Sequence, residues 1–193
     1  MKLLLENWRQ YLAEVSKQTE DVGHVLIDDD GDSVHITARG VEVEGKSPLL
    51  GHLIVARLSG DNFDAEDFDD TLKCENDLWW VLEAKAQKGY GPLLYDLALE
   101  YIFHTHSGKL MSGGHGETTG TVSTDAAKIW QYYFDNRHDV KRRKDPRCSD
   151  ILSPWVKEDP NLQKYHNALM HVYWKEEPTA LDELDHTEKI QYR

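Results

Sequence analysis

The segment that most constrains the fold runs from Trp79 to Phe103, where a strand pattern changes into a helical pattern across two glycines. Residues Asp77–Lys85 carry apolar side chains on both faces, which predicts a strand in the middle of a sheet. After Gly89 and Gly91, apolar residues recur with helical period, and Pro92 suits a first helical turn. We therefore expect a central strand, a tight turn and a packed helix in an α+β fold.

The glycine turn has the features of an anion-binding site. A strand that passes through glycines into a helix exposes unpaired backbone N–H groups at the positive end of the helix dipole, and glycine lets phosphate oxygens approach closely. A nucleotide P-loop needs Gly-Lys-Ser or Gly-Lys-Thr after four further residues, and the run Pro92-Leu93-Leu94 excludes it. A dinucleotide fingerprint is excluded because Leu94 occupies the place of its third glycine. The turn therefore predicts phosphate binding of another kind.

The stretch Lys85–Tyr95 (Lys-Ala-Gln-Lys-Gly-Tyr-Gly-Pro-Leu-Leu-Tyr) resembles the CoA-binding motif of the GCN5-related N-acetyltransferase (GNAT) superfamily, Arg/Gln-x-x-Gly-x-Gly/Ala between a central strand and a helix. The segment Ser123–Phe134 is similar to a later helix of that family, usually Asn-x-x-Ala-x-x-x-Tyr. The pattern also looks like small acetyltransferase-like proteins encoded by bacteriophages, and the resemblance covers roughly residues 49–137. It departs at Ala86, where the family has Arg or Gln, and at Trp130, where the family has a tyrosine that protonates the departing thiolate.

The resemblance implies acetyl-CoA as co-substrate and direct attack of an amine on its thioester. It also implies a mostly antiparallel, mixed central sheet flanked by helices. Glu83 is the predicted base; for the acid that protonates the sulfur, Tyr133 is the first choice and Tyr132 the second. Backbone N–H groups around Val81–Glu83 would stabilise the oxyanion. The residues expected to bind the cofactor are Val81, Leu82, Gln87, Lys88, Gly89, Tyr90, Gly91, Pro92 and Leu93.

The rest of the chain reads as one domain, residues 1–144, with a helical C-terminal extension, residues 145–193, packed on it. The predicted elements are a helix over Lys2–Lys17, a hairpin of His24–Ile27 and Ser33–Ala38, strands over Leu49–Leu58 and Lys109–Met111, and helices from Ser123 or Thr124 to Arg137, over Asn161–Tyr173 and over Thr179–Asp185. An acidic connection, Gly60–Asp70, and a glycine-rich loop, Ser112–Thr121, join these elements.

A metal site finds no support in the sequence. The acidic turn Asp28–Asp32 has carboxylates at the first, third and fifth positions of a calcium loop, but Ser33 and Arg39 stand where its glycine and its bidentate glutamate belong. The turn is therefore interpreted as a solvated hairpin turn. The histidines form no His-x-x-x-His pair beside a glutamate, and we interpret them as surface or packing residues.

Charge limits the partners of this chain. It carries 22 Lys and Arg against 35 Asp and Glu, a formal charge of −13, which disfavours nucleic acid and anionic membranes and attracts amines or basic protein segments. Cys74 and Cys148 suggest no disulfide framework, and the apolar run Leu3–Leu5 is too short for a signal peptide, so we expect a cytoplasmic protein, in the host cell if phage-encoded.

Two functions remain open from the sequence. The first is an N-acyltransferase that modifies an amine of a small molecule or protein. The second is a catalytically inactive, phage-encoded binding module that engages a host or virion protein, with a homodimer as a further arrangement. The glycine turn favours the first, and Trp130 favours the second. Group transfer to nucleic acid is disfavoured by the charge.

Overall fold

The computed structural model describes residues 19–58, 77–112, 122–144 and 159–193. Several sequence predictions lie outside these ranges: the helix over Lys2–Lys17, the acidic connection Gly60–Asp70 and, apart from Ser112, the glycine-rich loop Ser112–Thr121. Cys74 and Cys148 also lie outside them.

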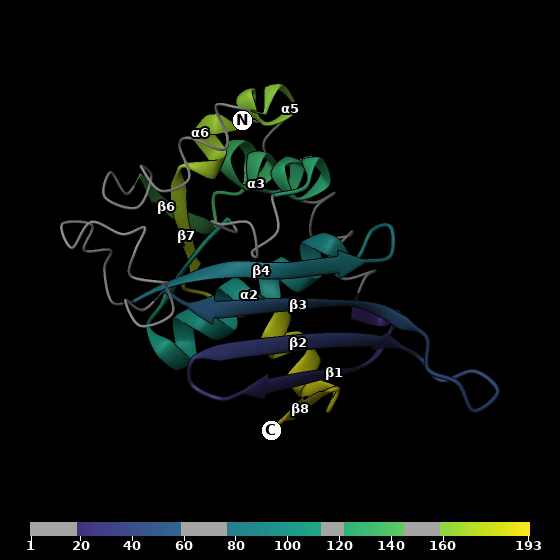
Figure 1. The fold of residues 1–193 in the computed structure, drawn as a ribbon. Coiled ribbons are helices and arrows are strands. Elements are labelled where there is room, and N and C mark those ends of the chain that lie inside the picture. Colours follow the sequence, from purple (N-terminus) through teal and green to yellow (C-terminus); the bar gives the residue numbers. More distant parts are fainter. Residues whose placement is uncertain (1–18, 59–76, 113–121, 145–158) are drawn as a thin grey trace, which may run out of the picture.

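The described residues form an α+β fold built on one mixed, curled sheet of eight strands (Figure 1). The strand order is β6-β7-β5-β4-β3-β2-β1-β8. The strands are β1 (Val22–Asp29), β2 (Ser33–Gly40), β3 (Leu49–Arg57), β4 (Leu78–Ala86), β5 (Lys109–Met111), β6 (Val140–Lys144), β7 (His171–Lys175) and β8 (Ile190–Tyr192). The predicted hairpin, third strand, central strand and short strand are confirmed as β1 to β5.

The first four strands make an antiparallel meander, since each pairs with the next. Burial alternates along β2, where Val34, Ile36 and Ala38 face the core. The acidic turn closes the first hairpin: the Asp30 carboxylate accepts hydrogen bonds from the Ser33 N–H at 2.6 Å and the Ser33 hydroxyl at 2.9 Å. These bonds, that from the Ser33 N–H first, lower the pKa of Asp30.

The central strand β4 changes partners along its length. On one side it pairs with β3 throughout, with a register irregularity opposite Ile54 and Val55. On the other side it pairs in parallel with β5 over only three residues, Leu78, Trp79 and Trp80. The remaining residues, Val81–Ala86, continue without a strand partner on that side among the described residues. The parallel pairing therefore ends with β5 at Met111, well before β4 reaches the glycine turn.

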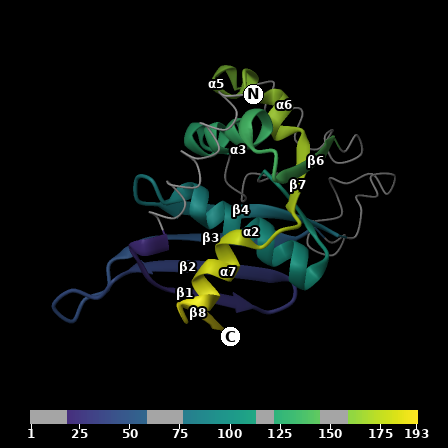
Figure 2. The same ribbon diagram turned by 180° about the vertical axis from the view of Figure 1, so that it is seen from behind.

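Helices cover one face of the sheet and its β6–β7 end. The helices are α2 (Gly91–His106), α3 (Thr124–Asn136), α5 (Pro160–Gln163), α6 (His166–Leu169) and α7 (Thr179–His186). Figure 2 shows α2 and α7 lying across one face of the sheet, with α3, α5 and α6 grouped beyond its β6–β7 end. Helix α2 buries Leu93, Leu94, Leu97 and Ile102 against the strands, as its helical period predicts. Helix α3 begins where Ser123 accepts a hydrogen bond from the Ala126 N–H at 3.1 Å.

The predicted helix over Asn161–Tyr173 is wrong. Two four-residue helices, α5 and α6, occupy its first part, and His171–Lys175 forms strand β7. Strand β7 lies between β5 and β6 and pairs antiparallel with both, so long-range pairing overrides the local helical pattern. The chain then forms α7, as predicted, and adds β8 in parallel beside β1. The C-terminal segment is thus part of the central sheet and is not purely helical.

A network of buried charges joins α2 to this C-terminal segment. Asp96 and Glu100 project from α2 with no exposed surface, and Arg137 and Lys175 are equally buried. The Arg137 guanidinium donates to both Asp96 carboxylate oxygens at 3.1 Å, and the Lys175 ammonium pairs with Glu100. Burial raises the pKa of Glu100, against the opposing effect of Lys175. Partner charges therefore offset the cost of burying these groups.

None of the helices in the described ranges is long and apolar enough to cross a membrane.

Candidate functional site

The candidate site is the glycine turn between β4 and α2. Gly89 has a φ of +99°, a left-handed conformation that glycine adopts without strain, and a Cβ built there would meet nothing within 4 Å. The turn is closed by a hydrogen bond from the Tyr90 N–H to the Gln87 carbonyl at 3.1 Å. Open space therefore lies beside a backbone that only glycine adopts readily.

The start of α2 presents free backbone donors. Tyr90 is the N-cap and makes no side-chain capping bond, and Pro92 has no N–H to satisfy. Among the described residues, no backbone or side-chain acceptor takes the N–H of Gly89, Gly91 or Leu93. With the helix dipole behind them, these donors suit an anion such as a phosphate oxygen.

Gly91 has a different role from Gly89. A Cβ at Gly91 would come within 3.0 Å of the Ile129 side chain on α3, so this glycine allows α3 to pack against the start of α2. The Tyr133 hydroxyl lies 3.0 Å from the Pro92 carbonyl oxygen and 2.7 Å from Asp96. Helix α3 therefore packs against the first turns of α2 and is hydrogen-bonded to them through Tyr133.

The other residues expected to bind the cofactor are divided between the turn and the core. Lys88 is exposed, and the Tyr90 hydroxyl donates to Asp21 at 3.2 Å. Gln87 is turned away, since its amide donates to the Leu49 carbonyl at 2.6 Å and holds β3 to the turn. Val81 and Leu93 are buried and Leu82 is partly buried, so only their backbone groups could face a ligand.

Glu83, the predicted base, lies on β4 three residues beyond Trp80, the last residue that pairs with β5. Its carboxylate accepts a hydrogen bond from Lys85 at 2.5 Å and lies 3.2 Å from His52 Nε2 on β3. The bond from Lys85, followed by that from His52, lowers the pKa of Glu83. Glu83 is therefore ionised at neutral pH but is a weakened proton acceptor. The sequence reasoning missed His52, because only the β3–β4 register brings it beside Glu83.

The two predicted acids differ in their surroundings. Tyr133 has no exposed surface, and its hydroxyl donates to the Asp96 carboxylate and the Pro92 carbonyl; its role as the acid stays a prediction. Tyr132 is partly buried on the flank of α3 and stays a prediction. Trp130 is fully buried against Tyr95 and Tyr173, with ring centroids 5.2 and 4.9 Å away.

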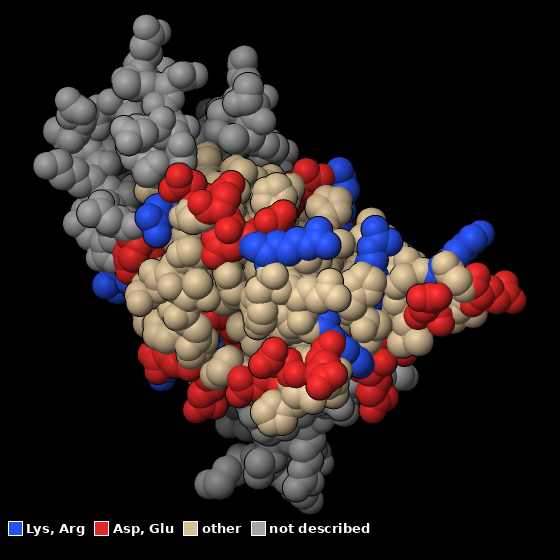
Figure 3. Space-filling model, turned by 90° about the horizontal axis from the view of Figure 1, so that it is seen from below, with Lys and Arg blue, Asp and Glu red and all other residues tan. Residues whose placement is uncertain are grey.

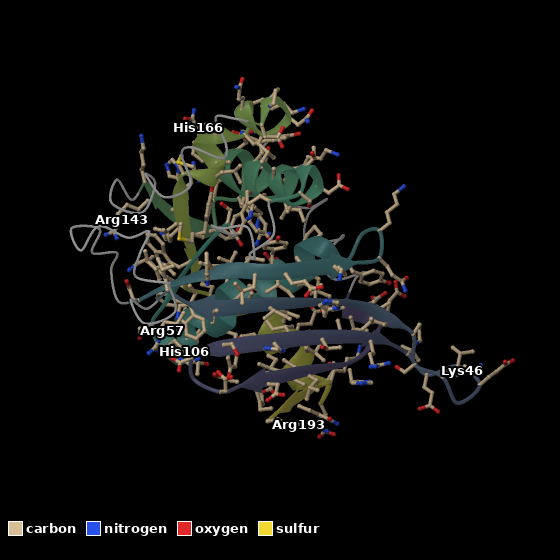
Figure 4. All side chains as sticks on the ribbon, in the orientation of Figure 1. Lys46, Arg57, His106, Arg143, His166 and Arg193 are labelled. Atoms are coloured by element: carbon tan, nitrogen blue, oxygen red, sulfur yellow. The ribbon has the colours of Figure 1, made fainter. Side chains whose placement is uncertain are left out.

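A second cluster of polar groups lies at the opposite end of the sheet, where Figure 4 labels His106 and Arg57. Asp29 accepts hydrogen bonds from the Tyr101 hydroxyl at 2.9 Å and from His106 at 2.8 Å. Burial and the bond to Asp29 raise the pKa of Tyr101 to about 12. His106 packs against Trp79, 4.6 Å between ring centroids, in keeping with its interpretation as a packing residue. Among the described residues no group of three or more His, Cys, Asp or Glu side chains is arranged to hold a metal ion.

Comparison with known proteins gives no relative from which a function could be transferred. No protein-family model matches the chain, and no curated protein and no solved structure matches it either.

Proposed function

We propose that this protein is an acyl-CoA-dependent N-acyltransferase with a GNAT-like fold, which transfers an acetyl group from acetyl-CoA to an amine of a small molecule or protein. One observation carries the proposal: among the described residues β4 has no strand partner on the β5 side after Trp80, and it leads through Gly89 to a helix start whose Gly89 and Gly91 N–H groups have no acceptor there. A central strand that leads through a glycine turn into a helix is the arrangement that the resemblance implies for the CoA-binding motif.

The residues of the turn fit a pyrophosphate. The free N–H groups of Gly89, Gly91 and Leu93 lie at the positive end of the α2 dipole and can donate to the phosphate oxygens. The exposed Lys88 adds a positive charge beside them. The backbone of Val81–Glu83, on the edge of β4 that β5 does not reach, would bind the rest of the thiol arm and the thioester carbonyl.

A neutral amine needs one proton to move from its nitrogen to the sulfur, and an ammonium substrate first releases a further proton to the solvent. The amine nitrogen forms a bond to the acetyl carbon, the carbon–sulfur bond breaks, and the thiolate takes a proton. The Glu83–His52 pair would accept the amine proton, either on Glu83 or on the imidazole that its carboxylate orients. Tyr133 and Tyr132 are the tyrosines from which a proton could reach the sulfur.

The surface charge favours a cationic acceptor. The chain carries a net charge of −13, and acidic side chains lie around much of the face shown in Figure 3. An amine substrate is protonated before it reaches the site, so a negative surface raises its local concentration.

Calorimetric titration with acetyl-CoA and with CoA tests the proposal. We expect micromolar binding, and a loss of more than about tenfold in Gly89→Leu, because the new side chain fills the space of the phosphate. Gly31→Leu is a matched control, since Gly31 has a φ of +91° and open space around it but lies in the β1–β2 turn. It should lose similar stability and keep its affinity. No detectable heat with either ligand would reject the proposal.

A second function, a catalytically inactive binding module, is favoured by the surroundings of α3. Trp130 occupies the position of the family tyrosine, and the nearby Tyr133 hydroxyl is bonded inside the core. This alternative predicts binding of acetyl-CoA without formation of free thiol in the presence of small amines or lysine peptides. The acyltransferase predicts thiol release, lowered by Glu83→Gln.

A further inference from the structure

The edge strand β6 differs in charge from the rest of the molecule. Its sequence is Val140-Lys-Arg-Arg-Lys144, and its four cationic side chains are all exposed, although the chain has a net charge of −13. Figure 4 labels Arg143 at the periphery of the fold beside this strand. Successive side chains of a strand point to opposite faces, so Lys141 and Arg143 lie on one face and Arg142 and Lys144 on the other. Both faces of this edge are therefore positive.

The backbone of β6 is open on one side among the described strands. It pairs antiparallel with β7 from Val140↔Lys175 to Lys144↔His171 and is the last strand at its end of the sheet. The outer edge of a strand presents a row of N–H and C=O groups that can pair with another extended chain.

Phe134 and His171 lie beside the basic side chains on one face of β6. The Arg142 guanidinium lies 4.9 Å from the centroid of the Phe134 ring, which packs edge-on against His171 at 5.0 Å. Burial first, and then the charges of Arg142 and Lys144, lower the pKa of His171, although its bond to the Asn167 carbonyl opposes them. Phe134 thus orients a guanidinium that remains exposed.

We propose that β6 is a docking edge for an acidic, extended segment of a partner protein, which adds to the sheet as a further strand beside β6. The backbone edge would supply the hydrogen bonds. Alternate acidic side chains of the segment all lie on one of its faces and would pair with the exposed Arg142 and Lys144. The proposal is independent of the acyltransferase function.

A protein segment fits this edge better than a nucleic acid does. Phosphates accept hydrogen bonds but cannot donate to the strand's carbonyl groups, which a peptide backbone satisfies. A nucleic acid would also extend its charge over the acidic remainder of the surface, whereas a short segment interacts within a Debye length of about 10 Å of the basic strand.

The probe is a nine-residue peptide of alternating Glu and Val with blocked ends, followed by fluorescence anisotropy in low salt. We expect it to bind the full-length protein and to bind about fivefold more weakly to Arg142→Gln/Lys144→Gln. Lys141→Gln, on the other face of the strand, should weaken it less. The double variant Lys46→Gln/Lys128→Gln removes the same charge from exposed positions elsewhere and should leave the affinity unchanged.

Four results would overturn the proposal. A peptide with Pro in place of Val has the same charge but lacks half of the N–H groups, and equal binding would show attraction by charge without strand addition. Tighter binding of a dT12 oligonucleotide would assign the edge to nucleic acid. Self-association that the β6 variants abolish would assign it to a second copy of the chain. Absence of binding to the Glu–Val peptide would leave the lysines and arginines as protection against edge-to-edge pairing.

Discussion

Two helices of this protein begin in opposite ways. At the start of α7, the buried Glu100 carboxylate accepts hydrogen bonds from the N–H groups of Ala180 at 2.9 Å and Leu181 at 2.7 Å. At the start of α2, the N–H groups of Gly89 and Gly91 have no acceptor among the described residues. One helix N-terminus is thus filled by an anion from inside the protein, and the other is left open.

The difference separates a structural anion from a site for an external one. Both helix ends carry the same partial positive charge, so both favour a negative group. Glu100 satisfies α7 and, through Lys175, links α2, β7 and α7 into one buried unit. Within the described ranges no carboxylate accepts a hydrogen bond from the Gly89 or Gly91 N–H at the α2 terminus, and the space beside Gly89 is open. We therefore expect changes at the first terminus to affect stability and changes at the second to affect binding.

The largest effect is expected from Lys175→Met. This change leaves Glu100 buried without its cation, and we expect a loss of about 3–5 kcal/mol in the free energy of unfolding, measured in urea. Lys128→Met is the matched control, since Lys128 forms an exposed pair with Asp125 and its loss should leave the free energy of unfolding nearly unchanged. If the two variants were equally stable, the buried network would not hold the C-terminal segment in place.

A smaller, pH-dependent effect is expected from Asp139→Asn. Burial alone would raise the pKa of Asp139, but its bonds to Arg137 at 2.8 and 2.6 Å outweigh this and lower it below the ordinary 3.8. A lowered pKa in the folded state contributes stability above pH 3.8 that is lost as the pH falls below this value. The variant should be less stable than the wild type at pH 7 and approach its stability as the pH falls below 3.8. A constant difference across this range would contradict the assignment.

The smallest effect on stability is expected from Tyr133→Phe, at the contact between α3 and the start of α2. Tyr133→Phe removes the hydroxyl between Asp96 and Pro92 and should cost about 1 kcal/mol. Tyr173→Phe removes a similar buried bond, to the Ala168 carbonyl at 2.7 Å, away from the α2 terminus. If the two variants are equally stable and only Tyr133→Phe binds acetyl-CoA more weakly, Tyr133 has a positioning role. If Tyr133→Phe binds acetyl-CoA normally but turns over more slowly, Tyr133 is the catalytic acid.

The local elements around the glycine turn could be read from the sequence because their patterns are local. Apolar residues on both faces of β4, the helical period after Pro92 and the serine cap of α3 each determine structure within a few residues. The segment after Asn161 could not be read in this way. Its apolar residues have helical spacing, yet Val172 and Tyr173 are buried by pairing with strands far along the chain.

The candidate site was predictable only as a backbone feature. The positive φ of Gly89 and the helix start after it follow from glycine and proline positions. The directions of side chains do not, because they depend on neighbours from other elements. Gln87 turns to the Leu49 carbonyl, and the β3–β4 register brings His52 to Glu83. Likewise, the sequence of β6 lacks alternation because a solvent-exposed edge buries little.

The most direct test of the two helix ends is an amide proton–nitrogen NMR titration with CoA. The account predicts that the signals of Gly89 and Gly91 shift as CoA is added, while those of Ala180 and Leu181, already bonded to Glu100, stay in place. Unchanged signals at Gly89 and Gly91, or shifts of equal size at all four residues, would contradict it.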